Sequence, residues 1–531
     1  MRRRNFLIST GAAVATGSAR SALAQPAIGG IAKKLIFVPQ ANLTSFEPYA
    51  SPSTTTRNFS LNVLETLFGV DVNFKPSPQM AEGHVVEDDG KRIIIRLREG
   101  LRFHHGEPVL ARDCVASLNR WMVRDSLGQT LHARLSSLEA TDDRTLVFRL
   151  KKPFPDLIYV LGNPSTPAFI LPSHIAEIDP FKPLTDIVGS GPFRFNKDEY
   201  VSGNLAVLSR FESYVPRTDT PNYTAGARRV HFDRVEWHII PDAATAVAGL
   251  QAGEIDWVEY PLPDLLQLLR RSQDVTVRQL DPNGLYPCMR LNHLQPPTDN
   301  PAVRRAILAT IRQSEVMRAV MGDDTHGYRL PTYEFLPGSP SDNTAAADRI
   351  GGHHSKDQIK AMLDAAGYRG ERLVLMHPVD QNFYNAMSSV VASELKDVGF
   401  NVDDQSMDWG TVVRRRASKG PLDKGGWSMF PTSYPGGDFR SPLTAFPLRG
   451  NGASAWYGWP DDPKIEALRE QWLDTADAAG RKRIAEQIQV QAYTNVPGVP
   501  LGNFLPSAAW RSNITGQLPG MSPVFWNVQK G

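Results

Sequence analysis

The chain has 531 residues, of which 41% are apolar and 21% are charged, a composition typical of a folded globular protein. Single hydrophobic cores stop growing at roughly 250–300 residues, so the length excludes one core and predicts two large lobes. The net charge is +2, but without Arg2, Arg3, Arg4 and Arg20, the only charged side chains of the first 24 residues, it is −2. A nearly neutral body gives no electrostatic reason to bind nucleic acid or an anionic membrane.

The first 24 residues have the organisation of an export signal. Three arginines precede an apolar stretch from Phe6 to about Ala15, and Ala22-Leu23-Ala24 has the small residues of a cleavage site. Arg3-Arg4-Asn5-Phe6-Leu7 resembles the twin-arginine signal, and the general secretory route stays open. We therefore expect a periplasmic protein that is cleaved near Ala24. No Cys follows that site and no later stretch has 18 uninterrupted apolar residues, so we expect neither a lipid anchor nor a membrane span.

Strand-like and helix-like patterns alternate through the first 320 residues. β-rich runs bounded by turn residues predict strands at 34–38, 91–97 and 145–150. Apolar residues at helical spacing predict helices at 111–121, 242–252 and 301–320. Asp242 and Gly253 are expected to cap the second of these helices, and Asn300 with Pro301 to begin the third.

The second half has the alternation of an α/β lobe. The patterns predict helices at 356–366, at 382–398 and from about 411, with strands at 373–376 and 401–402. Residues 420–459 are rich in aromatic residues, Gly and Pro, and they give little regular pattern. Long segments of this kind in compact domains are functional or disordered, and the aromatic content argues against disorder. Helices at 463–475 and 478–493 precede a β-like tail.

Five sequence blocks carry a family resemblance. The segment 91–106, KRIIIRLREGLRFHHG, resembles the signature region of the dipeptide, oligopeptide and nickel family of solute-binding proteins of ABC importers. Four further blocks are similar to that family in the same order: VGSGPF at 188–193, DAATAVAGLQAGEID at 242–256, NPAVRRAI at 300–307 and LDAAGYRG at 363–370. By this resemblance the chain is identified as a member of the family.

The resemblance implies an α/β architecture, the two-lobed periplasmic binding protein fold of type II in its large peptide-binder form, with a hinge between the lobes. The export signal at 1–24 is followed by lobe I at 25–280, with an inserted subdomain at about 75–185. Lobe II follows at 281–500, and a tail at 501–531 returns to lobe I. Such a protein captures a peptide or peptide-like solute between its lobes and delivers it to a membrane permease with a separate ATPase. We expect a monomer that has no cofactor and no enzyme activity.

Alignment with the peptide binders of the family places much of the cleft wall at 380–440. Trp409-Gly410 and Gly426-Trp427 match family positions. The Asp that holds a peptide ammonium in the family is replaced by Phe430, and the Arg that holds the carboxylate falls on Gln381. Because unpaired buried charges are costly, we expect that this cleft does not bind a free dipeptide in the usual way.

The candidate ligand-binding residues are drawn from both lobes. They are Thr55, Thr56, Arg57, Asp380, Gln381, Tyr384, Trp409, Trp427, Phe430, Tyr434 and Asp438. Aromatic walls with a few polar groups suit a mixed apolar and polar solute, and Asp380 or Asp438 is suited to a cationic group. The alternatives are core packing for the aromatic residues, a solvated loop for 55–57 and a turn cap for Asp438 after Gly436-Gly437.

Other interpretations stay open at this point. The solute is a peptide or, alternatively, a glycoside, an opine-like compound or a metal chelate, and a chemoreceptor is a possible further partner. A hydrolase using His104 or His105 is the alternative from another class. Adjacent histidines on a strand point to opposite faces, so we predict no metal site at 104–105 or 353–354. Cys114 and Cys288 are predicted to be thiols without a role, with a disulfide left open.

Overall fold

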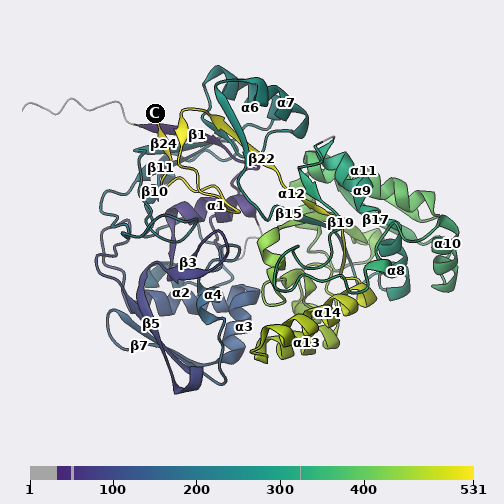
Figure 1. Ribbon diagram of the computed structural model, residues 1–531, viewed down its shortest axis with the longest axis horizontal. Coiled ribbons are helices and arrows are strands. Elements are labelled where there is room, and N and C mark those ends of the chain that lie inside the picture. The colour runs from purple at the N-terminus through teal and green to yellow at the C-terminus, as the bar shows by residue number, and fades with distance from the viewer. Residues whose placement is uncertain (1–32, 50–52, 323) are drawn as a thin grey trace, which may run out of the picture. The chain divides into compact units, whose positions relative to one another are not determined.

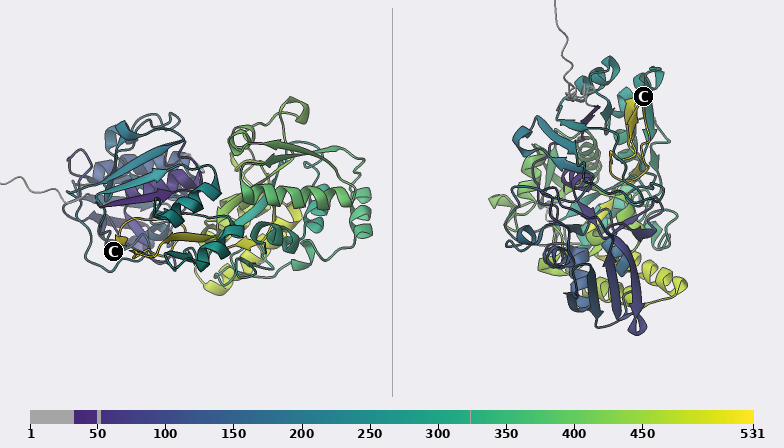
Figure 2. Two further views of the ribbon diagram at one scale, coloured as in Figure 1. Left: turned by 90° about the horizontal axis from the view of Figure 1, so that it is seen from above. Right: turned by 90° about the vertical axis from the view of Figure 1, so that its left-hand side faces the viewer.

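Strands from both ends of the described chain form the first of two large sheets (Figure 1, Figure 2). The structure is a computed structural model that describes residues 33–49, 53–322 and 324–531. The predicted export signal lies outside these residues. In spatial order the strands are β10 (Phe193–Phe195), β11 (Leu205–Arg210), β12 (Arg234–His238), β1 (Lys34–Val38), β13 (Trp257–Val258), β22 (Ser507–Arg511) and β14 (Val275–Gln279).

β1 confirms the predicted strand 34–38 and lies inside this first sheet, parallel to β12 and β13. Its side chains alternate between two clusters, because successive residues of a strand face opposite sides. Leu35 and Phe37 face the main core, while Ile36 and Val38 face α6 (Ala243–Ala252) and α7 (Pro263–Arg271). The caps of α6 are as predicted: Asp242 accepts from the Thr245 amide, and Gly253 has a φ of 80°.

A smaller antiparallel sheet is inserted between β1 and β10. Its order is β5 (Ala81–Glu87), β6 (Arg92–Leu97), β8 (Thr145–Leu150) and β7 (Leu135–Ala140). The associated helices are α1 (Thr54–Val63), α2 (Ala111–Arg124), α3 (Ser126–Arg134), α4 (Leu157–Leu161) and α5 (Ser173–Ala176). The short strands are β2 (Glu65–Thr66), β3 (Phe68–Val70), β4 (Pro76–Pro78) and β9 (Phe169–Ile170). The helix predicted at 111–121 and the strands predicted at 91–97 and 145–150 are confirmed as α2, β6 and β8.

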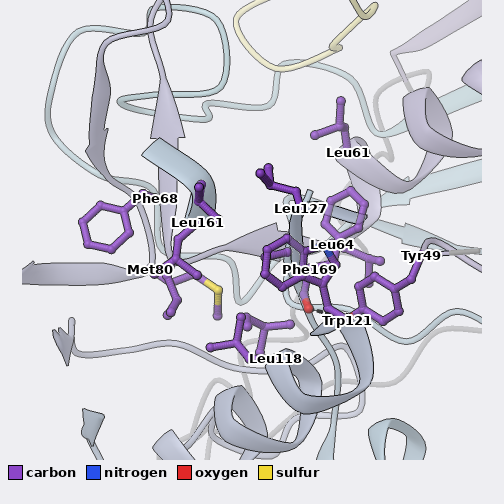
Figure 3. Packing of buried hydrophobic residues seen from close by; sticks show 14 of the residues in the cluster. Tyr49, Leu61, Leu64, Phe68, Met80, Leu118, Trp121, Leu127, Leu161 and Phe169 are labelled. Atoms are coloured by element: carbon purple, nitrogen blue, oxygen red, sulfur yellow. Dashed lines mark hydrogen bonds between the residues drawn. The ribbon is translucent and has the colours of Figure 1, made fainter. Parts of the chain in front are cut away.

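Apolar side chains from α1, α2 and the short strands form the core of this region. Figure 3 shows Trp121 and Leu118 of α2 among Leu64, Met80 and Phe169. Trp121, Leu118 and Phe169 are fully buried. Area-based transfer free energies assign roughly 1.5–3 kcal/mol to burial of each large side chain, so this packing fixes α1 against the inserted sheet.

The second large sheet has the order β16 (Tyr328–Arg329), β21 (Asn503–Phe504), β15 (Leu285–Leu291), β19 (Met429–Pro435), β17 (Arg372–Pro378) and β18 (Asn401–Met407), with β20 (Gly498–Pro500) paired to β15. Its helices are α8 (Pro301–Thr310), α9 (Gln313–Met321), α10 (Lys356–Ala365), α11 (Asn382–Asp397), α12 (Trp409–Arg415), α13 (Pro463–Asp474) and α14 (Ala478–Asn495). The fold is therefore α/β with two lobes, lobe I around the first large sheet and lobe II around the second. The chain crosses between them twice, from β14 to β15 and from β21 to β22.

The helix predicted at 301–320 is wrong in one respect, because the structure has two helices there. Asn300 caps α8 and Pro301 is its first residue, as predicted. At Arg312 the chain leaves the helical path: its backbone N–H donates to the Glu394 carboxylate at 2.9 Å, and its Nε donates to the same group at 2.8 Å. A tertiary contact with α11 thus replaces one helical hydrogen bond and separates α8 from α9.

The stretch 420–459 contains a strand that the sequence pattern did not predict. β19 pairs with the whole length of β15, from Leu285–Pro435 to Leu291–Met429. Prolines at 431 and 435 hide it, because proline lacks the N–H of a regular ladder. The rest of the stretch contains short 3₁₀ turns: η4 (Leu422–Lys424), η5 (Gly436–Arg440), η6 (Phe446–Leu448) and η7 (Gly452–Ser454).

One other local expectation needs correction. His104 and His105 lie in a turn and not on a strand. His104 contacts the turn that contains Gly189 and Gly191. Glycine is required at both positions by close approach, because a Cβ would lie 2.1 Å from the Val63 carbonyl oxygen at Gly189 and 2.6 Å from it at Gly191.

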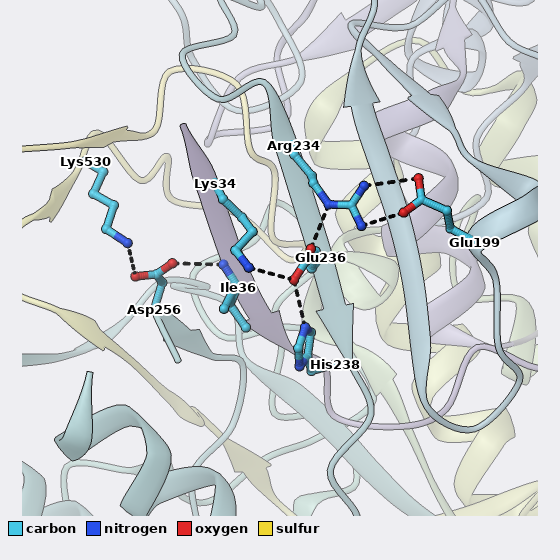
Figure 4. Close-up of polar contacts among 8 residues, drawn as sticks. All are labelled: Lys34, Ile36, Glu199, Arg234, Glu236, His238, Asp256 and Lys530. Carbon is cyan, nitrogen blue, oxygen red and sulfur yellow. Dashed lines mark hydrogen bonds and ion pairs between the residues drawn. The ribbon is translucent and has the colours of Figure 1, made fainter. Parts of the chain in front are cut away.

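Charged side chains join the C-terminal residues to the first sheet. Figure 4 shows Asp256 accepting from the Ile36 amide at 2.9 Å and from Lys530 Nζ at 2.7 Å. On the neighbouring strand, Glu236 lies 2.6 Å from Arg234 Nε and 3.3 Å from Lys34 Nζ. β23 (Ile514–Thr515) pairs with β24 (Gln529–Lys530), so the last residues are held in place.

Both cysteines are free thiols, and Cys114 is buried in the lobe I core. Across the described ranges, none of the helices combines the length and the apolar character that a membrane span requires.

Candidate functional site

The two lobes meet at η5, which follows β19 in lobe II. Arg440 Cζ lies 4.9 Å from the centre of the Phe74 ring of lobe I, and its Nη2 donates to the Asn73 carbonyl at 3.4 Å. A Cβ on Gly437 would lie 2.4 Å from Phe74 and 2.7 Å from Met521. The absence of a side chain at 437 therefore allows η5 to approach lobe I closely.

Asp438 lies in η5, is only 2% exposed, and has one carboxylate oxygen, Oδ2, without a partner among the described residues. Burial raises its pKa to about 7, while a hydrogen bond from Ser165 and the charge of Arg57 act in the opposite direction. Ser165 and Arg57 both belong to lobe I. The structure thus brings two of the predicted residues, Arg57 and Asp438, to the same seam from opposite lobes.

Arg57 is surrounded by further buried acids. Its charge opposes the effect of burial, which raises the pKa of Asp281 to about 6 and that of Glu259 to about 7. The Arg57 guanidinium itself donates to Asn58 Oδ1 at 3.0 Å and to the Met521 carbonyl at 3.4 Å. Asn58 in turn donates to Glu259 at 3.0 Å. Three carboxyl groups around one guanidinium give this seam an excess of acid, which suits a cationic guest.

A cluster of aromatic side chains lies on the face of the second sheet that α12 covers. The Trp427 and Phe430 rings are 5.0 Å apart and both side chains are fully buried. Phe430 lies 6.0 Å from Trp456, and the Tyr384 and Trp409 rings are 4.7 Å apart. We call the set formed by Tyr384, Trp409, Trp427, Phe430, Tyr434, Trp456, Tyr457 and Trp459 the aromatic box.

Tyr434 connects the aromatic box to the seam. Its ring lies 5.5 Å from Trp456 on one side and 5.8 Å from Phe439, the neighbour of Asp438, on the other. Tyr434 and Phe439 also line a cavity of about 30 Å³ together with Arg290 and Glu334. That volume holds one or two water molecules. Burial raises the pKa of Glu334 to about 8, against the opposing charge of Arg290, so this cavity is polar as well as aromatic.

The remaining predicted residues lie at the margins. Thr55 and Thr56 are buried in the first turn of α1, so the solvated-loop alternative for 55–57 is wrong. Thr56 Oγ1 donates to the Ser45 carbonyl at 3.0 Å. Asp380 is exposed, and its carboxylate accepts from the Trp409 amide at 2.8 Å. Gln381 caps α11 without a side-chain hydrogen bond to the helix.

Sequence reasoning missed Arg416, Trp456 and Tyr457. Arg416 ends a run of three arginines at the end of α12, a pattern that usually indicates a solvated face, yet it is only 3% exposed. Trp456 and Tyr457 fall in the aromatic stretch 420–459, which the sequence marks as functional without separating one aromatic residue from another. It also missed Asp281 and Ser165, because nothing local distinguishes a seam residue from a turn residue.

The histidine of the hydrolase alternative is held by backbone groups. His104 Nδ1 accepts from the Gly189 amide at 3.2 Å, and Nε2 lies 3.1 Å from the Gly191 carbonyl. Burial lowers the His104 pKa to about 4. With both ring nitrogens engaged, His104 is poorly placed to act as a general base. In the part of the chain that the structure describes, no group of three or more His, Cys, Asp or Glu residues is arranged to hold a metal.

Comparisons with known proteins agree on one family. The model of the bacterial extracellular solute-binding proteins, family 5, matches residues 75–454. A probable peptide ABC transporter periplasmic-binding protein of Sinorhizobium fredii is 35% identical over 537 residues, which cover 99% of each chain.

Two solved structures have the same fold at low sequence identity. A protein from A. tumefaciens R10 in complex with agropinic acid has a TM-score of 0.80 and 21% identity, covering 94% of this chain and 99% of that one. A dipeptide-binding protein from Pseudoalteromonas in complex with Met-Leu has a TM-score of 0.78 and 19% identity, covering 94% and 100%. Both have two-lobed folds of the kind described above.

Proposed function

Because the chain belongs to family 5 of the bacterial extracellular solute-binding proteins, we propose that it is the periplasmic solute-binding component of an ABC importer and that it captures a peptide or peptide-like solute between its lobes. The proposed partners are a membrane permease and its ATPase. Members of this family are solute-binding proteins, and the proposed role is binding without chemical change of the solute. The relative from Sinorhizobium fredii, which carries a peptide transporter name, supports the choice of solute class.

The observation that carries the proposal is the buried, partly unpaired carboxylate of Asp438. One of its carboxylate oxygens has no partner among the described residues, although the side chain is buried at the contact between the lobes. A buried carboxylate oxygen in this condition lacks a hydrogen-bond donor, and a solute ammonium group would supply one. The family's usual Asp is replaced by Phe430, and Asp438 offers the same chemistry eight positions further along the chain. Thr55, Thr56 and Arg57 of lobe I form the opposite wall in this proposal.

Binding is proposed to couple to closure. Lobe I at 25–280 and lobe II at 281–500 would move about the two crossings, with the tail from 501 returning to lobe I. A solute that contacts Arg57 on one side and Asp438 on the other binds the closed form better and so increases its population. The permease would then recognise the closed form.

Export is proposed to depend on residues 1–24, removed near Ala24 by the twin-arginine or the general secretory route. The relative from Sinorhizobium fredii is described as periplasmic, which supports this location.

The test begins with the solute that the protein carries. We would purify the protein from its native periplasm, denature it and identify the released small molecules by untargeted mass spectrometry. The proposal predicts an intact peptide-like compound with a cationic group. An opine-like compound, a glycoside or a metal chelate would replace the peptide assignment, and a cleaved product would favour the hydrolase.

The variant Asp438→Asn tests the residue. Loss of a charge-assisted hydrogen bond is expected to weaken binding of that compound by roughly ten- to hundredfold in calorimetric titration. Asp423→Asn, an exposed acid in η4 of the same lobe, is the matched control. Equal affinity of the Asp438→Asn and Asp423→Asn variants would remove Asp438 from the site.

A further inference from the structure

Three consecutive arginines at the end of α12 have three different surroundings. Arg414 Nη2 donates to Thr411 Oγ1 at 2.7 Å on the exposed side of the helix. Arg415 donates to Gln405 Oε1 at 2.6 Å and to the Gly426 carbonyl at 2.8 Å. Arg416 turns inward, where its Cζ lies 4.6 Å from the centre of the Tyr457 ring, 5.5 Å from Trp456 and 6.0 Å from Trp409. It is therefore the one member of this run that enters the aromatic box.

Arg416 has no carboxylate partner among the residues that the structure describes. Its Nε is buried and makes no hydrogen bond there. Burial lowers its pKa, and a side-chain hydrogen bond with Tyr457 acts in the opposite direction. Cation–π contacts offset only part of the hydration that a guanidinium loses on burial, so the charge of Arg416 is only partly compensated.

Arg290 of the same lobe is a buried guanidinium with hydrogen-bond acceptors for its donors. It is 1% exposed, yet it donates to the carbonyl oxygens of Tyr457 at 2.6 Å, Pro447 at 2.7 Å and Trp456 at 3.3 Å. These bonds fix the backbone that carries Trp456 and Tyr457. Arg290 thus holds the wall of the box, whereas Arg416 faces the aromatic rings of that wall and its Nε makes no hydrogen bond among the described residues.

We propose that Arg416 is the anchor for a carboxylate of the solute, whose apolar part lies against Trp409, Trp456 and Tyr457. This inference rests on the proposed function and names the solute class more closely. A single guanidinium matches a singly charged carboxylate, and its planar fork matches the two carboxylate oxygens. Trp409, Trp456 and Tyr457 are only half-buried, so this side of the box is the side that a solute can reach.

The distribution of charge in lobe II supports a solute with both signs. Among the described residues, Asp438 Oδ2 at the seam has no hydrogen-bond donor, and Arg416 Nε in the box has no acceptor. Tyr434 and Phe439 lie between them. The two unpaired groups are replacements for the two family anchors that are missing from positions 430 and 381. The solute class is therefore a peptide-like zwitterion with a carboxylate beside an apolar group.

The test uses the small-peptide fraction of a casein hydrolysate before and after its carboxylates are converted to amides with carbodiimide and ammonia. The untreated fraction should raise the melting temperature of the wild-type protein, and the amidated fraction should do so much less. The Arg416→Met variant should respond weakly and equally to both fractions. Arg416→Lys should recover part of the response, and Arg414→Met, the matched control, should behave as the wild type.

Individual peptides isolated from the bound fraction should bind Arg416→Met roughly ten- to hundredfold more weakly than the wild type. The melting temperature of Arg416→Met without peptide distinguishes a binding role from a packing role. If Arg416 serves binding, removal of its poorly compensated buried charge should leave the melting temperature unchanged or raise it. A large decrease would overturn the inference. Continued discrimination between acids and amides by Arg416→Met would overturn it as well.

Failure of the proposed function gives a different result. If the untreated hydrolysate does not shift even the wild-type protein, the peptide assignment fails and this inference fails with it. If the wild type responds equally to acids and amides, the proposed function stands and only the role of Arg416 is rejected.

Discussion

Asp438 is a titrating group whose effect on stability has a definite sign. Burial raises its pKa from 3.8 to about 7, with Asp125 and Asp281 acting in the same direction and Ser165 and Arg57 against it. Between these two values the folded protein holds a proton that the unfolded chain has released. The free energy of unfolding of the solute-free protein therefore falls as the pH rises through this window.

We expect the Asp438→Asn variant to lose much of that slope. At pH 8 it should be more stable than the wild type by about 2–4 kcal/mol, since one unit of pKa shift corresponds to about 1.4 kcal/mol. Urea denaturation between pH 4 and 8 measures both quantities. Some slope should remain, because burial also raises the pKa values of Asp281 and Glu259. Parallel curves for variant and wild type would show that Asp438 is not the titrating group.

Gly437 is the second residue whose chemistry bears on the seam. A Cβ there would collide with the Phe74 ring and with Met521, both of lobe I. Overpacking of this kind costs about 1–3 kcal/mol, and it applies only when the lobes touch. Gly437→Ala should therefore weaken binding of the released native solute by roughly fivefold or more in calorimetry.

Gly83→Ala is its control, because a Cβ at Gly83 meets no atom within 4 Å. If the Gly437→Ala and Gly83→Ala variants bound the solute equally well, close approach at η5 would have no part in binding.

At the scale of elements, α3 of lobe I and α13 of lobe II carry complementary charges. Arg134 lies 2.7 Å from Glu470 and 2.9 Å from Asp474, and Lys152 lies 2.6 Å from Asp474. Arg481 of α14 pairs with Asp156 at 2.9 Å. These pairs join the two lobes, and we expect them to stabilise the closed form.

Neutralising this acidic side should therefore favour opening. The double variant Glu470→Gln, Asp474→Asn is expected to release solute several times faster in stopped-flow fluorescence, since each pair contributes up to about 1 kcal/mol. The difference should shrink in high salt. Asp397→Asn, which breaks an exposed pair with Lys356 within lobe II, is the control. An unchanged release rate would mean that α3 and α13 do not hold the lobes together.

Elements were predictable where their causes are local. Asp242, Gly253 and Asn300 identify helix ends by capping chemistry, and the β-rich run at 34–38 identifies a strand. β19 escaped because its prolines conceal a pairing that only β15 supplies. The break between α8 and α9 escaped because its cause, Glu394, lies on another helix.

The sequence predicted which residues contribute to the site, but it did not predict which of them contact one another. Family alignment named Trp409 and Trp427, the aromatic content of the stretch added Tyr434, and all three belong to the aromatic box. Alignment also led to the expectation that both charge anchors were absent. Whether Asp438 and Arg416 have partners depends on tertiary packing. The local sequence therefore does not show that a carboxylate oxygen lacks a hydrogen bond or that a guanidinium lacks a carboxylate partner.

At the scale of the whole molecule, two α/β lobes are joined by two crossings and meet at a seam that contains buried ionisable groups. The seam contains unpaired groups that would be costly to bury without a guest. A solute and lobe closure must therefore stabilise one another, and removal of the solute should open the seam to water.

Small-angle X-ray scattering of the purified protein, with and without its native solute, tests this coupling most directly. We expect the radius of gyration to fall when the solute saturates the protein, and we expect the Asp438→Asn variant to need more solute to reach the same value. A protein that binds its solute to saturation with an unchanged radius of gyration would contradict capture by closure.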